Sequence, residues 1–530
     1  MTEAISNTTA PAESGRRRGA GRKARIAERM SALTDELKPV KPGISGGKYR
    51  VLSDNQIAQI NEAILEVLET IGLANATPSV IEHCTRVGAQ LGDDGRLRFP
   101  RNVVENAKQT ACRKVTLFAR NPDQDLVLEG TRVHFGTGGA AVHIVDARTG
   151  EYRDSLLRDV YDMARVVDCC EHIHFYFRTV VARDIPDMFE LDVNTHYAII
   201  QGTTKHVGGS FSVPEAVHAT LDMLHEIAGG EEAWRERPFV STNSCFVVPP
   251  LTFAEDACNC LEIAVKGGMP VNLLSAGQAG ATGPAALAGT VVQEMAECLA
   301  ALVYVNSIKP GAPAVLGMWP FVSDLRTGAM SGGSGEQAVL MCASAQVANS
   351  YGLPVSVAGA MTDSKMPDIQ SGFEKGCNQT LIGNSGANMI YESAGMHASL
   401  LGACYESLIL DNDSLGAAMR TVRGIEVDSN SLSVDVIADV TMNGPNHYLG
   451  SEQTLRLMQT EYIYPEVCDR LSPKEWKEQG QQLALDRAQA KVENILADHF
   501  PNPISAAADH SIRAKLPIKL AKSEMGPNAN

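Results

Sequence analysis

The sequence predicts an α/β protein: a (β/α)8 TIM-type barrel with an N-terminal α+β extension and a C-terminal helix. Short apolar or β-branched segments repeat at steps of 31 to 44 residues, beginning near Val133, His174, His206, Phe239, Pro270, Ala314, Val355 and Asn388. Segments of helical periodicity lie between them, for example 214–230 and 334–352. Eight strands, each followed by a helix at this spacing, are typical of the barrel. The main alternative is a doubly wound open sheet, and the absence of GxGxxG after the first strand and of GxxxxGK[ST] disfavours it.

The segments before and after the repeat complete the predicted organisation. Residues 53–72 predict an amphipathic helix, with Ser53 and Gln56 as a capping box and Gly72 at its end. Two strands follow near 114–120 and 125–130, joined by the turn NPDQ. We therefore expect a disordered basic tail over 1–45, the α+β extension over 46–130, the barrel over 131–415 and a helical, peripheral region over 416–530. The segment 472–500 is expected to form the C-terminal helix.

Composition restricts the class of protein. The chain has 530 residues, of which 44% are hydrophobic and 20% charged, with no apolar run of about 18 residues and no apolar signal core at the N-terminus. We expect a soluble, cytoplasmic protein without a membrane partner. The net charge of −16 argues against a nucleic-acid binder. The basic segment SGRRRGAGRKAR is interpreted as a solvated tail, with an RNA- or membrane-contacting arm as the alternative.

The twelve cysteines are scattered, and only Cys169-Cys170 and Cys258-x-Cys260 are close pairs. Neither pair has a second CxxC or a histidine at ligand spacing, so we expect reduced structural thiols and no metal site. A zinc site at Cys258 and Cys260 is disfavoured, because residues at i and i+2 of a helix point to different faces.

The carboxyl ends of the predicted strands carry the candidate site, because barrel chemistry lies at that end. Aromatic residues gather there in a chain that is only 5% aromatic: Phe211, Phe246, Trp319, Phe321 and Tyr391. With Asp363 and Glu392 they predict a cage for an organic cation, and Asn243 and His206 complete the predicted binding set. His206 and His397 are candidates for a general acid or base. The alternative is ordinary packing at the barrel mouth, with the carboxylates paired to Lys365 or Lys205.

Several motifs together carry a family resemblance over most of residues 50–500. They include HFGTGG, TTKHVGGSF, GMPVNLLSAGQAGATGPAALAGTVV, YGLPVSVAGAMTDSKMPDIQSGFEK and SGANMIYESAGM. In this order they resemble the corrinoid-dependent trimethylamine/quaternary-amine methyltransferase family. The resemblance implies a (β/α)8 protein that moves a methyl group from an amine to the cobalt of a separate corrinoid protein.

The resemblance also implies where this chain departs from the trimethylamine enzymes. Met361 stands at the position of their pyrrolysine, between a strand end like theirs and the segment TDSKMPD. Without that electrophilic residue, a quaternary amine such as glycine betaine becomes the expected substrate, with Met361, Asp363 and Glu392 as the catalytic candidates.

We expect no cofactor bound in the chain, because the D-x-H-x-x-G pattern of base-off cobalamin proteins is absent. The resemblance therefore implies cob(I)alamin and methylcobalamin carried by a partner corrinoid protein, and the chain itself is expected to form a homo-oligomer. The alternatives are a non-catalytic betaine-binding or sensing barrel and a trimethylamine methyltransferase proper.

Overall fold

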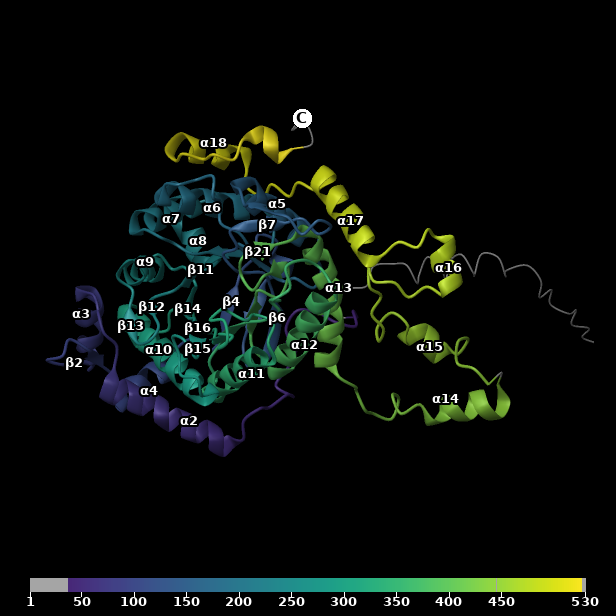
Figure 1. Cartoon of the computed structure of the whole chain (residues 1–530), viewed down its shortest axis with the longest axis horizontal. Coiled ribbons are helices and arrows are strands. Elements are labelled where there is room, and N and C mark those ends of the chain that lie inside the picture. The colour runs from purple at the N-terminus through teal and green to yellow at the C-terminus, as the bar shows by residue number, and fades with distance from the viewer. Residues whose placement is uncertain (1–36, 445, 527–530) are drawn as a thin grey trace, which may run out of the picture. The chain divides into compact units, whose positions relative to one another are not determined.

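The computed structural model describes residues 37–444 and 446–526. Its centre is a nine-stranded sheet in the order β1-β6-β19-β18-β16-β14-β11-β10-β9, shown in Figure 1. Most of the predicted basic tail lies outside the described residues. The last two residues assigned to the tail form β1 (Ile44–Ser45), which pairs antiparallel with β6.

The eight strands other than β1 are parallel, and each lies where the sequence repeat predicts one. They are β6 (Arg132–Phe135), β9 (Phe175–Phe177), β10 (His206–Gly209), β11 (Val240–Ser244), β14 (Val271–Ser275), β16 (Ala314–Met318), β18 (Val355–Ala358) and β19 (Met389–Tyr391). The ends of this sheet meet, because Gly136 forms a parallel bridge with Phe175 and the His174 amide donates to the Phe135 carbonyl at 2.7 Å. The predicted barrel is confirmed.

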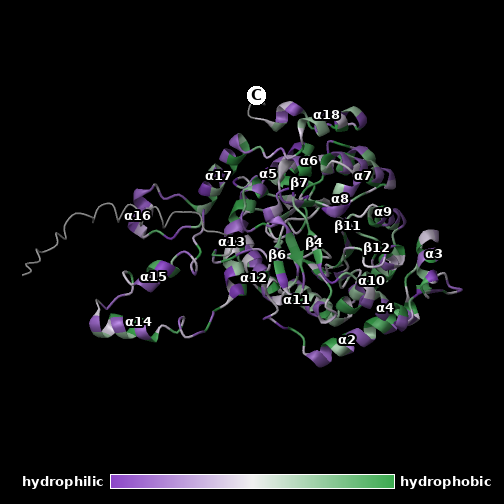
Figure 2. Ribbon diagram, turned by 180° about the vertical axis from the view of Figure 1, so that it is seen from behind, coloured by the Kyte–Doolittle hydropathy of each residue, from purple (hydrophilic) through white to green (hydrophobic). Residues whose placement is uncertain are grey.

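A helix follows each barrel strand, and Figure 1 shows these helices around the sheet. They are α5 (Leu157–Asp168), α6 (Met188–Gly202), α7 (Pro214–Ala228), α9 (Glu255–Lys266), α10 (Leu287–Ile308), α11 (Gly335–Ser350), α12 (Ile369–Ser385) and α13 (Tyr405–Arg423). The predicted barrel boundary at 415 falls inside α13, so the barrel runs to about the end of that helix. Figure 2 shows hydrophobic colour on the central strand β6 and frequent hydrophilic colour on the outer helices.

Helix α10 is long and apolar enough to cross a membrane by length and composition, and is the one such helix among the described residues. Most of it, 78% of its most apolar window, is buried inside the protein. It packs against β14 and β16. We therefore assign it as a core helix of the barrel.

Two aromatic side chains occupy space inside the barrel that is left free by glycines on the neighbouring strands. A Cβ atom on Gly136 would lie 2.3 Å from the Phe175 ring, and one on Gly208 would lie 1.9 Å from the Phe177 ring. Both distances are far shorter than any tolerated contact, so only glycine at these positions lets the two rings occupy the interior. This packing places Phe175 and Phe177 under the barrel mouth.

The N-terminal extension contains α2 (Asp54–Glu66), α3 (Pro78–Arg86), α4 (Arg101–Thr110) and the antiparallel pair β4 (Val115–Leu117) and β5 (Leu126–Leu128). The capping box of Ser53 and Gln56 and the hairpin are confirmed. The helix predicted to reach Gly72 is interrupted, because Val67–Ile71 form a π-helical turn before Gly72 at a φ of 62°. This turn shifts the helical phase, and the Ile71 side chain is exposed.

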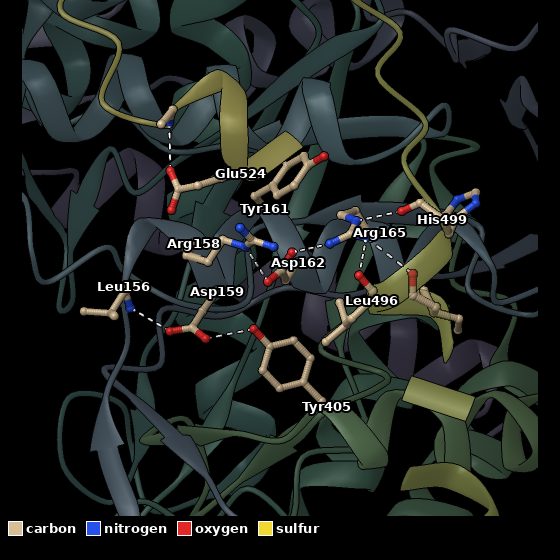
Figure 3. Close-up of polar contacts among 12 residues, drawn as sticks. Leu156, Arg158, Asp159, Tyr161, Asp162, Arg165, Tyr405, Leu496, His499 and Glu524 are labelled. Carbon is tan, nitrogen blue, oxygen red and sulfur yellow. Dashed lines mark hydrogen bonds and ion pairs between the residues drawn. The ribbon is translucent and has the colours of Figure 1, made fainter. Parts of the chain in front are cut away.

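The predicted C-terminal helix is two helices, α16 (Pro473–Glu478) and α17 (Ala484–Asp498), followed by α18 (Ala506–Lys515). Gly480 and Gln481 have φ angles of 89° and 56°, which no α-helix can contain, so the chain turns between them. Figure 3 shows how α17 is attached to α5: Arg165 donates to the His499 carbonyl at 2.7 Å and to the Leu496 carbonyl at 2.8 Å.

The chain divides into two compact units, and the larger comprises residues 42–425 and 464–530. The smaller unit includes residues 426–463, with α14 (Val434–Ala438), the π-helical η3 (Asp439–Asn443) and α15 (Glu452–Leu457). Among the described residues of 426–463, only Val440 is buried. This segment therefore has no hydrophobic core of its own.

Candidate functional site

An aromatic cluster lies at the carboxyl end of β19. The Tyr391 ring centroid is 4.9 Å from that of Phe175, 5.2 Å from that of Phe177 and 4.9 Å from that of Trp319. The interplanar angles are 64°, 75° and 46°, so the rings meet edge-on or tilted. All four side chains are buried. The arrangement presents electron-rich ring faces, which attract organic cations.

A chain of hydrogen bonds crosses four neighbouring strands and fixes the orientation of Trp319. The indole Nε1 donates to Ser356 Oγ at 3.1 Å, and Ser356 Oγ donates to Asn272 Oδ1 at 2.8 Å. Asn272 Nδ2 donates in turn to Asn243 Oδ1 at 3.0 Å. These residues come from β16, β18, β14 and β11, so the predicted Asn243 and Trp319 are joined through two polar side chains of the barrel interior.

Glu392 follows Tyr391 directly and is buried. Within the described part of the chain its Oε2 atom has no hydrogen-bond partner. Burial raises the pKa of this carboxyl from 4.5 to about 8. Its φ angle of 56° is uncommon for a residue other than glycine, and a Cβ on Gly138 would lie 3.3 Å from its Cγ atom. A strained backbone and a buried, unpaired carboxyl beside the aromatic cluster mark a ligand-binding position.

Met361 lies on the neighbouring strand end, after β18, and is fully buried. The preceding Ala360 has a φ of 69°, so two adjacent strands both end in a left-handed residue. Each such residue costs on the order of 1–3 kcal/mol, which the surrounding packing must offset. A Cβ on Gly332 would lie 2.9 Å from the Met361 Cβ, so the 331–333 loop closes directly over this methionine.

Asp363 holds the loops around Met361. Its carboxylate accepts hydrogen bonds from Ser331 Oγ at 2.7 Å, the Gly332 amide at 2.7 Å and Ser399 Oγ at 2.8 Å. Glu374 of α12 holds the same segment from the other side, accepting from the Asp363 amide at 2.9 Å and from Thr362 Oγ1. Asp363 is thus already engaged by three donors, and this geometry gives it a positioning role.

The other predicted binding residues are not brought to the aromatic cluster. Phe211 stacks on His196 of α6, with ring centroids 4.3 Å apart and an interplanar angle of 7°. Phe246 is buried in the loop after β11, and Phe321 belongs to β17 (Phe321–Val322), which pairs with β15 (Gln278–Ala279). Of the five predicted cage residues, Trp319 and Tyr391 are in ring contact with each other, and Phe175 and Phe177 contact Tyr391 in addition.

His206 is the first residue of β10, at the opposite end of the barrel from the site. Its Nδ1 is 2.7 Å from the Phe118 carbonyl and its Nε2 is 2.9 Å from Ser241 Oγ. Burial lowers its pKa to about 4. The structure places a neutral, satisfied imidazole there, away from Tyr391 and Glu392. His397 lies in β20 (Met396–His397), where its Nε2 is 2.7 Å from Ser407 Oγ and burial lowers its pKa.

Sequence reasoning missed Phe175, Phe177, Asn272 and Ser356. The first two stand in the strand sequence FYF, which is typical of any hydrophobic core. Asn272 and Ser356 carried a usable signal, because a polar side chain inside an apolar strand needs a buried partner.

No group of three or more His, Cys, Asp and Glu side chains able to hold a metal occurs in residues 37–444 and 446–526. Cys258 and Cys260 are buried in α9, and burial raises the pKa of both thiols to about 12. Such thiols stay protonated at neutral pH and are poor zinc ligands.

Comparison with known sequences gives a consistent family. A family model described as trimethylamine methyltransferase (MTTB) matches residues 16–525. Trimethylamine methyltransferase MttB of Desulfitobacterium hafniense (strain DSM 10664 / DCB-2) is 32% identical over 486 residues, covering 92% of this chain and 97% of the relative. Glycine betaine methyltransferase of Desulfitobacterium hafniense (strain Y51) is 30% identical over 476 residues, covering 90% and 97%.

Among solved structures, the monomethylamine methyltransferase of Methanosarcina barkeri is similar with a TM-score of 0.46 and 12% sequence identity. The similarity covers 89% of this chain and 92% of that one.

Proposed function

Because the chain belongs to the trimethylamine methyltransferase family, we propose that it moves a methyl group from a quaternary amine to the reduced corrinoid of a partner protein. A glycine betaine-like compound is the proposed substrate. Methyl transfer itself is common to the named relatives. The observation that carries the choice of a cation is the buried, unpaired carboxyl of Glu392 beside the Tyr391 cluster.

The electrostatics of the site favour a permanent positive charge on the substrate. A carboxyl with a pKa of about 8 is largely protonated at neutral pH, and a cation beside it would favour its ionised form. The rings of Trp319 and Tyr391 supply further attraction of about 0.5–2 kcal/mol per cation–π contact. The site can therefore hold a quaternary ammonium without any other charged partner.

The chemistry of the leaving group agrees with this substrate class. When the C–N bond of a quaternary ammonium breaks, its electron pair stays on nitrogen and the amine leaves neutral. The reduced corrinoid cobalt of the partner supplies the nucleophile for the methyl group. No general acid is required, which fits the position of His206 at the other end of the barrel and the contact of His397 Nε2 with Ser407 Oγ. The residues of this chain have to bind the cation, orient one methyl group and exclude water, and orientation alone contributes several kcal/mol.

Met361 fits a wall of such a pocket. Trimethylamine needs activation before its methyl group can leave, and the resemblance places pyrrolysine in this role in the archaeal trimethylamine enzymes. A thioether is soft, apolar and compatible with N-methyl groups, but cannot form an adduct with an amine. Asp363 and Glu374 then act as positioning residues, because their carboxylates hold the loops that enclose Met361.

A partner that delivers the corrinoid has to approach the barrel mouth. Large apolar side chains are exposed on segments that follow the carboxyl ends of three adjacent strands, between 60% and 89% exposed: Leu325, Ile369, Phe373 and Leu401. Exposed apolar residues grouped at the rim of a site are typical of an interaction surface. We propose that the corrinoid protein docks on this rim.

The proposed function is tested by supplying a panel of methylated amines and cob(I)alamin, free or on a cognate corrinoid protein, and following methylcobalamin by absorbance. We expect transfer from glycine betaine, faster with the corrinoid protein than with free cobalamin. Rapid transfer from trimethylamine would instead favour the trimethylamine enzyme. Tight betaine binding without any transfer would favour the non-catalytic binding barrel.

A further inference from the structure

Arg178 follows the last residue of β9 at the barrel mouth and has no counter-ion. Its amide donates to the Gly208 carbonyl at 3.2 Å, which fixes its backbone between two strand ends. Among residues 37–444 and 446–526, its guanidinium forms no hydrogen bond and no ion pair within 4.0 Å. Arginine carries five donors and stays charged, so a guanidinium left without partners in a protein recess is rare.

The nearest opposite charge is already used. Asp192 of α6 interacts electrostatically with Arg178, but its carboxylate accepts hydrogen bonds from the Ser212 amide at 2.6 Å, Ser212 Oγ at 3.1 Å and the Val213 amide at 3.3 Å. These bonds hold the segment between β10 and α7. Asp192 therefore leaves the guanidinium donors unfilled.

The Arg178 side chain is half-buried, and desolvation lowers the pKa of its guanidinium. Cys245 behaves in the same way: the thiol is exposed, yet desolvation raises its pKa, and the charge of Arg178 opposes that rise. Cys245 lines a cavity of about 70 Å³ together with Ser210 and Asn243. The charge of Arg178 thus acts on Cys245, one of the residues that line this cavity.

Arg178 stands at the same strand ends as the proposed cation site. The preceding residue, Phe177, contacts the Tyr391 ring of the aromatic cluster, and Asn243 connects the cavity to Trp319 through the interior hydrogen bonds. A bare guanidinium this close to a quaternary ammonium would repel it. The repulsion disappears if the same substrate carries an anionic group that the guanidinium binds.

We propose that Arg178 is a specificity-determining residue that binds the carboxylate of a zwitterionic substrate whose quaternary ammonium lies against Tyr391 and Trp319. This inference rests on the proposed function and narrows it to betaines with a short spacer between the two charges. It excludes choline and tetramethylammonium, which have the same methylated nitrogen but no anion.

The test is calorimetric titration of the full chain with glycine betaine and with choline. We expect the wild type to prefer glycine betaine. Arg178→Gln is expected to weaken glycine betaine binding about 10- to 150-fold, the range of a charged hydrogen-bonded contact, and to leave choline within about 3-fold. Arg178→Lys keeps the positive charge but loses the planar guanidinium, so we expect its affinity for glycine betaine to lie between those of the wild type and Arg178→Gln. Arg183→Gln is the matched control, because Arg183 lies in the same connection and is ion-paired with Asp154.

Several results would overturn the inference: equal binding of choline and glycine betaine by the wild type, or an Arg178→Gln variant that retains full betaine affinity or loses both ligands equally. Unchanged betaine binding with slower transfer to the corrinoid protein would assign Arg178 to the partner instead. Methyl transfer from choline as fast as from glycine betaine would contradict carboxylate binding by Arg178 and would still support the proposed methyltransferase function. If Arg178→Gln loses its preference for glycine betaine over choline, but no amine supports methyl transfer, the proposed methyltransferase function would be wrong and carboxylate binding by Arg178 would be supported.

Discussion

Charged side chains are balanced differently in two regions of the molecule. Between α5 and α17 the guanidinium of Arg165 is fully buried, and it donates to Asp162 at 2.7 Å and to backbone carbonyls of α17 and the residue that follows it (Figure 3). At the barrel mouth, within the described residues, Glu392 Oε2 has no partner and the guanidinium of Arg178 has none either. The first region is complete without a ligand, and the second is not.

This difference separates structural from functional charges. A buried ion whose donors and acceptors are all used stabilises one arrangement of the chain, and removing its partner is costly. A buried charged group with an unpaired donor or acceptor lowers the stability of the protein. Such groups occur at functional sites, where a ligand can supply the missing partner. The two strained residues Ala360 and Glu392 belong to the second region, which agrees with this division.

The largest expected effect is on the α5–α17 contact. Arg165→Ala removes one of the two donors to Asp162 and the donor to the His499 and Leu496 carbonyls, so we expect a loss of about 3–5 kcal/mol of unfolding free energy in urea denaturation. The matched control is Arg148→Ala, which removes an exposed pair with Asp486 and should cost less than about 1 kcal/mol. Equal losses in the two variants would contradict the assignment of Arg165 as a structural charge.

Removing the unpaired carboxyl of Glu392 should raise the free energy of unfolding at high pH, whereas Arg165→Ala lowers it. The pKa of Glu392 is raised from 4.5 to about 8 in the folded state. Below pH 4.5 the carboxyl is protonated in both the folded and the unfolded state. Between pH 4.5 and about 8 the unfolded state ionises first, so the free energy of unfolding falls, by up to about 5 kcal/mol above pH 8. Glu392→Gln should therefore be more stable than the wild type at pH 9 and similar near pH 4.5. The matched variant Glu374→Gln should be less stable, since it loses a carboxylate with several donors. If Glu392→Gln is less stable than the wild type at pH 9, the Glu392 carboxyl is not unpaired in the folded protein.

An intermediate effect is expected for the ring faces. Trp319→Ala should weaken glycine betaine binding about 2- to 30-fold in calorimetry, the range of one cation–π contact. Trp234→Ala is the control, because Trp234 is equally buried but donates to the Gly267 carbonyl beside α8 (Glu231–Glu236). Unchanged affinity for every betaine in Trp319→Ala would exclude the aromatic cage.

The smallest effect is expected at Met361. Met361→Leu changes volume and polarity little, so the methyl-transfer rate should stay within about 3-fold of the wild type. Met361→Lys should abolish transfer, because its charge would repel the substrate and require burial of an ammonium. Loss of activity in Met361→Leu would show that the thioether itself takes part.

The barrel could be predicted from the sequence because its strands recur at regular steps with helices between them. Trp319, Tyr391 and Glu392 could be placed at the site because they stand directly at strand ends. Side-chain direction beyond a strand end could not be predicted, since the backbone leaves the alternating pattern there. Phe211, for example, stacks on His196 of α6. His206 was misplaced because it begins its strand rather than ending it.

The central claim is that Glu392 lacks a partner until a ligand binds. Its most direct test is the number of protons released when glycine betaine binds. In the free protein Glu392 is largely protonated at pH 7, and a bound quaternary ammonium should ionise it. Calorimetric titration at pH 7 in two buffers of different ionisation enthalpy should therefore show about one proton released per glycine betaine bound, and close to none in Glu392→Gln. Binding by the wild type without proton release would contradict the account, since the unpaired carboxyl would then not be the group that the ligand completes.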